Sequence, residues 1–80
     1  MKKLYLIIVS PEKLLFNGEV ESVTLPGSAG SFTILAQHAP IVSSLTAGRL
    51  VYVTNSEEHT SNIRGGFVEM NNNQITVCVE

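Results

Sequence analysis

The sequence predicts an all-β protein, an antiparallel β-sandwich or flattened barrel of short strands. Short runs rich in β-branched and aromatic residues recur along the chain, and tight-turn residues separate them at short intervals. Apolar and polar residues alternate within several runs, as they do in strands with one buried face. One domain, residues 1–80, is expected, because a chain of 80 residues buries only about 60% of its unfolded surface and cannot support two cores.

The first strand is expected at Leu4–Val9, whose continuous apolar run is typical of a strand buried on both faces. This run is far below the ~18 residues needed to cross a bilayer, so we expect no transmembrane segment. Ser10–Lys13 then resembles a helix start, with serine as the cap and proline at the first helical position. Gly18 follows too soon for more than one or two helical turns.

Further strands follow at regular intervals. Val20–Leu25 alternates in polarity, with Glu21, Val23 and Leu25 on one side. The other expected strands are Phe32–Ala36, Leu50–Thr54, Ile63–Met70 and Ile75–Val79. Within Ile63–Met70, the pair Gly65-Gly66 predicts a bulge or bend. Turns are expected at Asn17-Gly18, Pro26-Gly27, Asn55-Ser56 and Asn71-Asn72-Asn73.

Composition and charge restrict the classes of partner. With 44% hydrophobic and 15% charged residues, the chain belongs among globular proteins. A net charge of -2 with five Lys plus Arg argues against a nucleic-acid partner, which requires many cationic contacts. The single cysteine, Cys78, indicates a reducing compartment, and its place in an alternating strand predicts a buried or half-buried thiol rather than a reactive one.

No pattern of residues predicts catalysis or a bound cofactor. His38 could pair with Ser43 or Ser44 as base and nucleophile, but such combinations arise by chance in any small chain. His38 and His59 lie in different expected loops, without the spacing of a metal site. Gly27–Gly30 lacks the following helix that a phosphate-binding loop requires. We therefore expect no catalytic residues, no metal and no cofactor, and an interaction as the function.

The order of motifs resembles a known family over nearly the whole chain. The matching segments are Val-Ser-Pro-Glu at 9–12, Phe16 with Gly18-Glu19-Val20, the turn Pro26–Gly30, His38-Ala39-Pro40 with Leu45 and Gly48, and Gly65-Gly66-Phe67-Val68-Glu69. In this order they resemble the amino-terminal domain of the epsilon subunit of F-type ATP synthases, the counterpart of the mitochondrial delta subunit.

The resemblance implies a flattened antiparallel β-sandwich of about ten short strands that acts as a non-catalytic rotor subunit of the central stalk. Such a subunit docks the gamma subunit onto the membrane c-ring and so couples proton or other ion translocation to ATP synthesis. It would be peripheral, at the cytoplasmic face of the bacterial inner membrane. By position, the residues that would face the c-ring are Gly27, Ser28, Ala29, Gly30 and Ser31, and those that would face gamma are Ser10, His38, Ala39, Pro40, Val42 and Ser43.

Two departures from the family pattern affect this expectation. Family members often carry an acidic residue in the Gly27–Ser31 turn, which here is neutral. The family's carboxy-terminal pair of helices, which can inhibit ATP hydrolysis and bind ATP, does not follow Glu80, so no helical inhibition or nucleotide binding is expected.

Two questions remain open at the level of sequence. Ile41, Val42 and Leu45 could form a gamma-facing patch or complete the core, because alternation is unclear there. The alternative function is a small β-sandwich that binds a ligand such as a sugar, although two Tyr, three Phe and no Trp supply few aromatic platforms. An enzymatic function is the third possibility, after these two.

Overall fold

The computed structural model describes residues 3–80, in which all regular secondary structure is β. Nine strands follow one another along the chain, in place of the ten or so expected. They are β1 (Leu4–Val9), β2 (Leu14–Val20), β3 (Ser22–Gly27), β4 (Gly30–Leu35), β5 (Ile41–Leu45), β6 (Gly48–Thr54), β7 (Glu57–Ile63), β8 (Gly66–Asn71) and β9 (Gln74–Val79).

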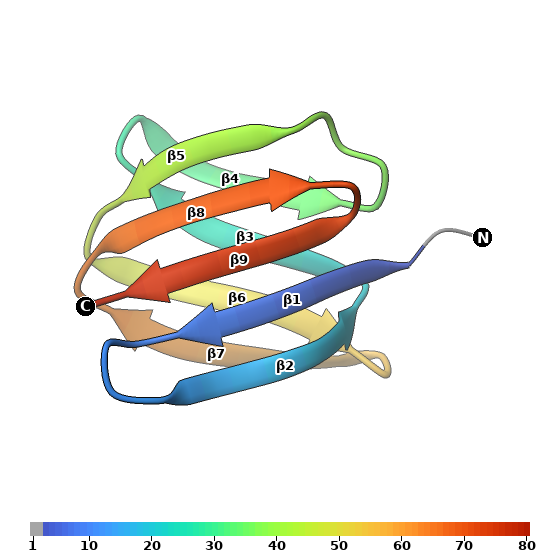
Figure 1. Cartoon of the computed structure of the whole chain (residues 1–80), viewed down its shortest axis with the longest axis horizontal. Coiled ribbons are helices and arrows are strands. Elements are labelled where there is room, and N and C mark those ends of the chain that lie inside the picture. The colour runs from blue at the N-terminus through green and yellow to red at the C-terminus, as the bar shows by residue number, and fades with distance from the viewer. Residues whose placement is uncertain (1–2) are drawn as a thin grey trace.

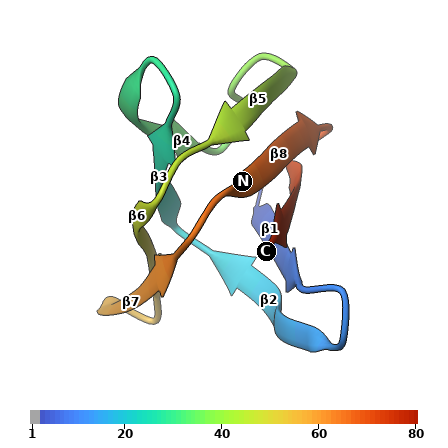
Figure 2. The ribbon, with the colours of Figure 1, turned by 90° about the vertical axis from the view of Figure 1, so that its left-hand side faces the viewer.

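The strands form one curled sheet that folds into two layers (Figures 1 and 2). The first layer has the order β2-β1-β9-β8-β5, and the second has the order β4-β3-β6-β7. The layers join where β3 meets β5, through the residue pair Gly27 and Leu45. All pairings are antiparallel except that of β1 with β9, which is parallel. The all-β sandwich expected from the sequence is confirmed, with this one parallel pairing as a correction.

Aliphatic side chains from both layers fill the space between them. No polar or charged side chain is buried among the described residues, so the interior is held by apolar packing alone. The buried hydrophobic residues are Leu4, Leu6, Ile8, Val20, Val23, Leu25, Ile34, Leu45, Leu50, Val68, Met70, Ile75, Val77 and Val79.

Strand β1 has the predicted bounds but only one buried face. Leu6 and Ile8 point into the core, whereas Tyr5 is 37% exposed and Ile7 is half-buried. The expectation of burial on both faces was wrong, because no described element covers the outer side of the first layer.

The expected short helix after Ser10 does not form. The Ser10 hydroxyl oxygen accepts bonds from the backbone N–H groups of Glu12 (3.4 Å) and Lys13 (3.3 Å), which are the contacts of a helix cap. The chain then enters β2 instead, and Gly18, expected in a turn, pairs with Leu6 of β1. Pairing with β1 satisfies the backbone polar groups on one side of this edge strand.

Two expected strands are each divided, because the chain passes between the layers. Val20–Leu25 is interrupted at Glu21, whose N–H donates to the carbonyl of Val53 at 2.7 Å. Ile63–Met70 is interrupted at Arg64 and Gly65, and both Gly65 and Gly66, which begins β8, have positive φ (155° and 142°). The glycine pair is therefore a crossing between β7 and β8 rather than a bulge within one strand.

The turns were predicted with mixed success. Asn55-Ser56 and Asn72-Asn73 form the tight turns of the β6–β7 and β8–β9 hairpins, all four with positive φ. Pro26-Gly27 instead ends β3, and the turn follows at Ser28-Ala29.

Alanine substitutions at two glycines with positive φ should differ in cost. At Gly66, an added Cβ would lie 2.0 Å from the carbonyl oxygen of Cys78, so Gly66→Ala must displace the β8–β9 backbone. At Gly30 (φ 130°), nothing lies within 4 Å of an added Cβ, and only backbone strain remains. We expect Gly66→Ala to lower the free energy of unfolding by more than about 4 kcal/mol and Gly30→Ala by about 1–3 kcal/mol, measured by urea denaturation. Equal effects would contradict the steric explanation.

Strand β8 allows a second test, of which face is core. Met70 is 1% exposed and Phe67 is 50% exposed on the opposite side. Met70→Ala should destabilise the fold by about 2–5 kcal/mol, because it leaves a cavity. Phe67→Ser should cost about 1 kcal/mol or less, because the ring already contacts water. Denaturation midpoints with unchanged slopes would report both values, and a larger loss for Phe67→Ser would refute the assignment of faces.

Candidate docking surfaces

The outer side of the first layer, which faces the reader in Figure 1, carries exposed apolar side chains. Strand register places Val9, Cys78 and Phe67 in one row across β1, β9 and β8. Val42 of β5 is 75% exposed and Phe67 is 50% exposed, although neither is needed by the core. We call this surface the apolar face, after its apolar members Ile7, Val9, Leu14, Val42, Phe67 and Cys78. Exposed Glu69 lies on the same side, paired with Val42 across β5 and β8. Exposed apolar side chains gathered on one face make this surface a candidate for an interaction site.

A hollow of about 450 Å³ lies on the apolar face near the end of β1. Val9, Phe67 and Cys78 line it together with Ser10 and Pro11. Cys78 is half-buried, as the sequence predicted. The lining is mostly apolar, so the hollow is suited to an apolar side chain of a partner.

The sequence-predicted gamma-facing residues do not form one cluster. Val42 lies on the apolar face, and Ser10 lines its hollow. Ser43 is half-buried and points to the opposite side of β5 from Val42. His38, Ala39 and Pro40 lie in the exposed β4–β5 loop, at the start of β5.

The alternatives for Ile41, Val42 and Leu45 are now distinguished. Leu45 is 6% exposed and belongs to the core, and Ile41 packs against it. Only Val42 is available to a partner. Phe67, Val9 and Leu14 were not predicted for the site.

The five predicted c-ring-facing residues form the β3–β4 hairpin. Gly27 pairs with Gly30 at its base, and Ser28 and Ala29 form its exposed tip. Ser28 bonds to β5 twice, through its N–H to the carbonyl of Ser44 (3.2 Å) and through the two hydroxyl groups (2.7 Å). The tip carries no charged side chain. It is a fixed, neutral projection at the end of the molecule where β5 terminates (Figure 1).

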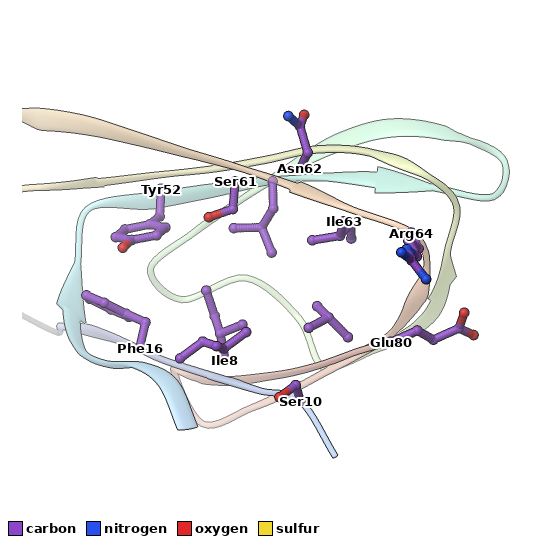
Figure 3. Close-up of a pocket in the computed structure, with 12 residues that line it drawn as sticks. Ile8, Ser10, Phe16, Tyr52, Ser61, Asn62, Ile63, Arg64 and Glu80 are labelled. Atoms are coloured by element: carbon purple, nitrogen blue, oxygen red, sulfur yellow. The ribbon is translucent and has the colours of Figure 1, made fainter. Parts of the chain in front are cut away.

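A smaller cavity of about 300 Å³ lies between the layers, on the side away from the β3–β5 junction (Figure 3). Ile8 and Phe16 line it from the first layer, and Tyr52 from the second. The Phe16 and Tyr52 rings lie 4.4 Å apart, and Tyr52 stacks on His59 at 5.1 Å, both measured between centroids. This stack connects β2 to β6 and β7 where no backbone pairing does.

His38 makes no hydrogen bond to either serine that the sequence suggested as its partner. The Nδ1 atom of His38 lies 2.8 Å from the carbonyl oxygen of Ala39, whereas the Ser43 hydroxyl donates to the carbonyl of Ser44 and the Ser44 hydroxyl bonds to Ser28. The nucleophile and base considered from sequence therefore do not meet. Within residues 3–80, no three His, Cys, Asp or Glu side chains are grouped to hold a metal ion.

Comparison with known proteins identifies relatives of this chain. The family model described as "ATP synthase, Delta/Epsilon chain, beta-sandwich domain" matches residues 3–80. An ATP synthase epsilon chain of Leptospira interrogans is 41% identical over 78 residues, which are 98% of this chain and 61% of the relative. An ATP synthase epsilon chain of Caulobacter vibrioides is 36% identical over 80 residues, which are 100% of this chain and 93% of the relative.

Solved structures share the fold. A chain of the Euglena gracilis mitochondrial ATP synthase (OSCP/F1/c-ring) matches with a TM-score of 0.90 at 21% identity, covering 96% of this chain and 50% of that one. A chain of the Tetrahymena thermophila mitochondrial ATP synthase central stalk and c-ring matches with a TM-score of 0.83 at 18% identity, covering 98% and 63%.

The described residues contain no helix with the length and apolar character needed to cross a bilayer. The match from Lys3 to Glu80 includes all nine strands, the apolar face and the β3–β4 turn. This chain belongs to the family of ATP synthase delta/epsilon chain beta-sandwich domains.

Proposed function

We propose that this chain is a non-catalytic rotor subunit of the central stalk of an F-type ATP synthase. It docks the gamma subunit onto the membrane c-ring and so couples ion translocation to ATP synthesis. The observation that carries the proposal is the family match over residues 3–80, which includes every strand of the sandwich. The named relatives are bacterial epsilon chains, and the peripheral position at the cytoplasmic face of the bacterial membrane follows from the proposal.

The apolar face is the proposed gamma-binding surface. Val42 and Phe67 expose apolar area that the fold does not use, and the hollow beside Ser10 can receive an apolar side chain. The loop of His38, Ala39 and Pro40 borders the start of β5 and is proposed to contact gamma at the edge of the same surface. Ser43 points the other way and would contribute by supporting β5.

The turn Gly27–Ser31 is the proposed c-ring contact. Its tip offers hydroxyl groups and backbone polar groups rather than carboxylates. A contact without charged pairs depends on shape and hydrogen bonds, so added salt should weaken it little. The two hydrogen bonds to Ser44 hold the tip in position for such a contact.

Introducing a charge on the apolar face should abolish gamma binding while the fold is retained. Val42→Asp places a carboxylate on a surface that gamma would desolvate, and we expect at least about tenfold weaker binding. Leu35→Asp is the matched control, because Leu35 is 57% exposed on β4 of the other layer. The chain would be co-expressed with the gamma subunit of the same genome and examined by size exclusion with light scattering.

Three outcomes of this experiment are informative. Loss of a one-to-one complex for Val42→Asp alone, with an unchanged circular dichroism spectrum, supports the assignment. Equal binding by both variants would refute the apolar face as the gamma surface. A folded parent chain that never binds gamma or the gamma–c-ring assembly would refute the proposed function.

Cross-linking tests the c-ring contact. Cys78 would first be replaced by Ser, and a single thiol then introduced as Ala29→Cys at the turn tip. In membranes that contain the assembled complex, we expect a cross-link to the c subunit, with a yield that changes little between low and moderate salt. Glu58→Cys on β7 is the exposed control and should not react with the ring. Cross-linking from both positions, or from position 58 alone, would contradict the assignment.

A further inference from the structure

The two proposed partner surfaces meet at the junction of β3 with β5. Here the first and second layers are joined by backbone bonds, from the N–H of Thr46 to the carbonyl of Pro26 (2.8 Å) and from the N–H of Ser28 to the carbonyl of Ser44 (3.2 Å). The hairpin tip on β3–β4 and the strand on which Val42 lies are therefore directly connected.

A pair of hydroxyl groups adds a side-chain contact at this junction. The Oγ atoms of Ser28 and Ser44 lie 2.7 Å apart, a normal distance for a hydrogen bond between hydroxyls. Ser44 pairs with Phe67 across β5 and β8, so it lies at the margin of the apolar face. Ser28 lies at the tip of the turn. The hydroxyl pair thus extends from one proposed partner surface to the other.

The tip needs such a restraint, because glycines flank it. Gly27 and Gly30 stand at the base of the two-residue tip. Gly30 has φ of 130° and open space around the position of a Cβ, so side-chain packing does not restrict it. Gly27 is buried against Phe32. The remaining freedom lies in Ser28 and Ala29, and of these only the Ser28 side chain bonds to another strand.

We propose that Ser28 and Ser44 are positioning residues, whose hydroxyl pair fixes the ring-facing turn relative to the gamma-facing strand and so transmits torque between them. This inference rests on the proposed function. The backbone bonds of Ser28 and Thr46 hold the base of the turn against β5, and the hydroxyl pair adds a side-chain restraint at the tip. With the pair in place, the force passes directly to β5 and hence to the apolar face.

Hydrogen exchange tests the restraint without any partner. Ser28→Ala and Ser44→Ala each remove one hydroxyl, and both should speed exchange of the Ser28 and Thr46 amides by about fivefold, as expected for one surface hydrogen bond. The double variant should equal either single variant, because both remove the same bond. Ser44→Thr keeps a hydroxyl and should restore slow exchange. Thr24→Val is the matched control, since it removes the Thr24–Thr33 hydroxyl pair (2.9 Å), which lies within the second layer.

The assembled ATP synthase tests the role in coupling. Membranes carrying each variant would be compared for ATP-driven ion pumping per ATP hydrolysed and for retention of the subunit on gamma. We expect the ratio to fall equally for Ser28→Ala and Ser44→Ala and to be unchanged for Ser44→Thr and Thr24→Val.

Failure of this inference and failure of the proposed function give different results. Unchanged exchange at Ser28 and Thr46 would overturn the restraint. Faster exchange with an unchanged pumping ratio, or a ratio altered by only one of the two alanine variants, would overturn the positioning role. A parent chain that does not bind gamma or the ring would instead overturn the proposed function.

Discussion

The packing of two aliphatic layers against each other is the interaction on which this small fold depends. Strands β1, β3, β8 and β9 bury every second side chain, and no polar or charged side chain is buried among the described residues. Because a short chain buries few residues, each buried side chain, such as those of Leu6, Leu50 and Ile75, is needed for the stability of the core. The apolar side chains on the outside, Val42 and Phe67 above all, are free of this requirement. They are the residues of the surface proposed above to bind gamma.

The two layers are connected differently along their two long edges. At the β3–β5 junction, backbone hydrogen bonds and the Ser28–Ser44 pair connect the layers. On the opposite side, β2 and β7 do not pair with each other, and the layers are connected by the Phe16–Tyr52 ring contact and by the Thr54 hydroxyl, which donates to the carbonyl of Glu19 in β2 at 2.9 Å. The side with backbone bonds between the layers is the one that carries the turn proposed to face the c-ring.

Much of the fold could be predicted from the sequence, and the failures have physical causes. Strand β9 was predictable from alternation and β1 from its continuous apolar run, but β7 is a polar edge strand whose pairing with β6 no local pattern reveals. Gly65-Gly66 signalled an irregular backbone, yet only the tertiary structure distinguishes a crossing from a bulge. Resemblance to the family supplied the site residues, while Phe67 was missed. Its spacing of two from Glu69 marks the solvent side of β8 and could have identified it.

The neutrality of the Gly27–Ser31 turn and its attachment to β5 have a common consequence. A charged tip can follow a moving partner through long-range attraction, because such forces act over several ångströms and tolerate displacement. A tip with only hydroxyl and backbone groups holds a partner through short contacts, which are lost when it moves by about an ångström. Such a contact transmits force only if a neighbouring strand restrains the tip. Ser44 provides this support, and it pairs with Phe67 at the margin of the apolar face. The absence of charge at the tip and the hydroxyl pair behind it are thus two parts of one mechanical arrangement.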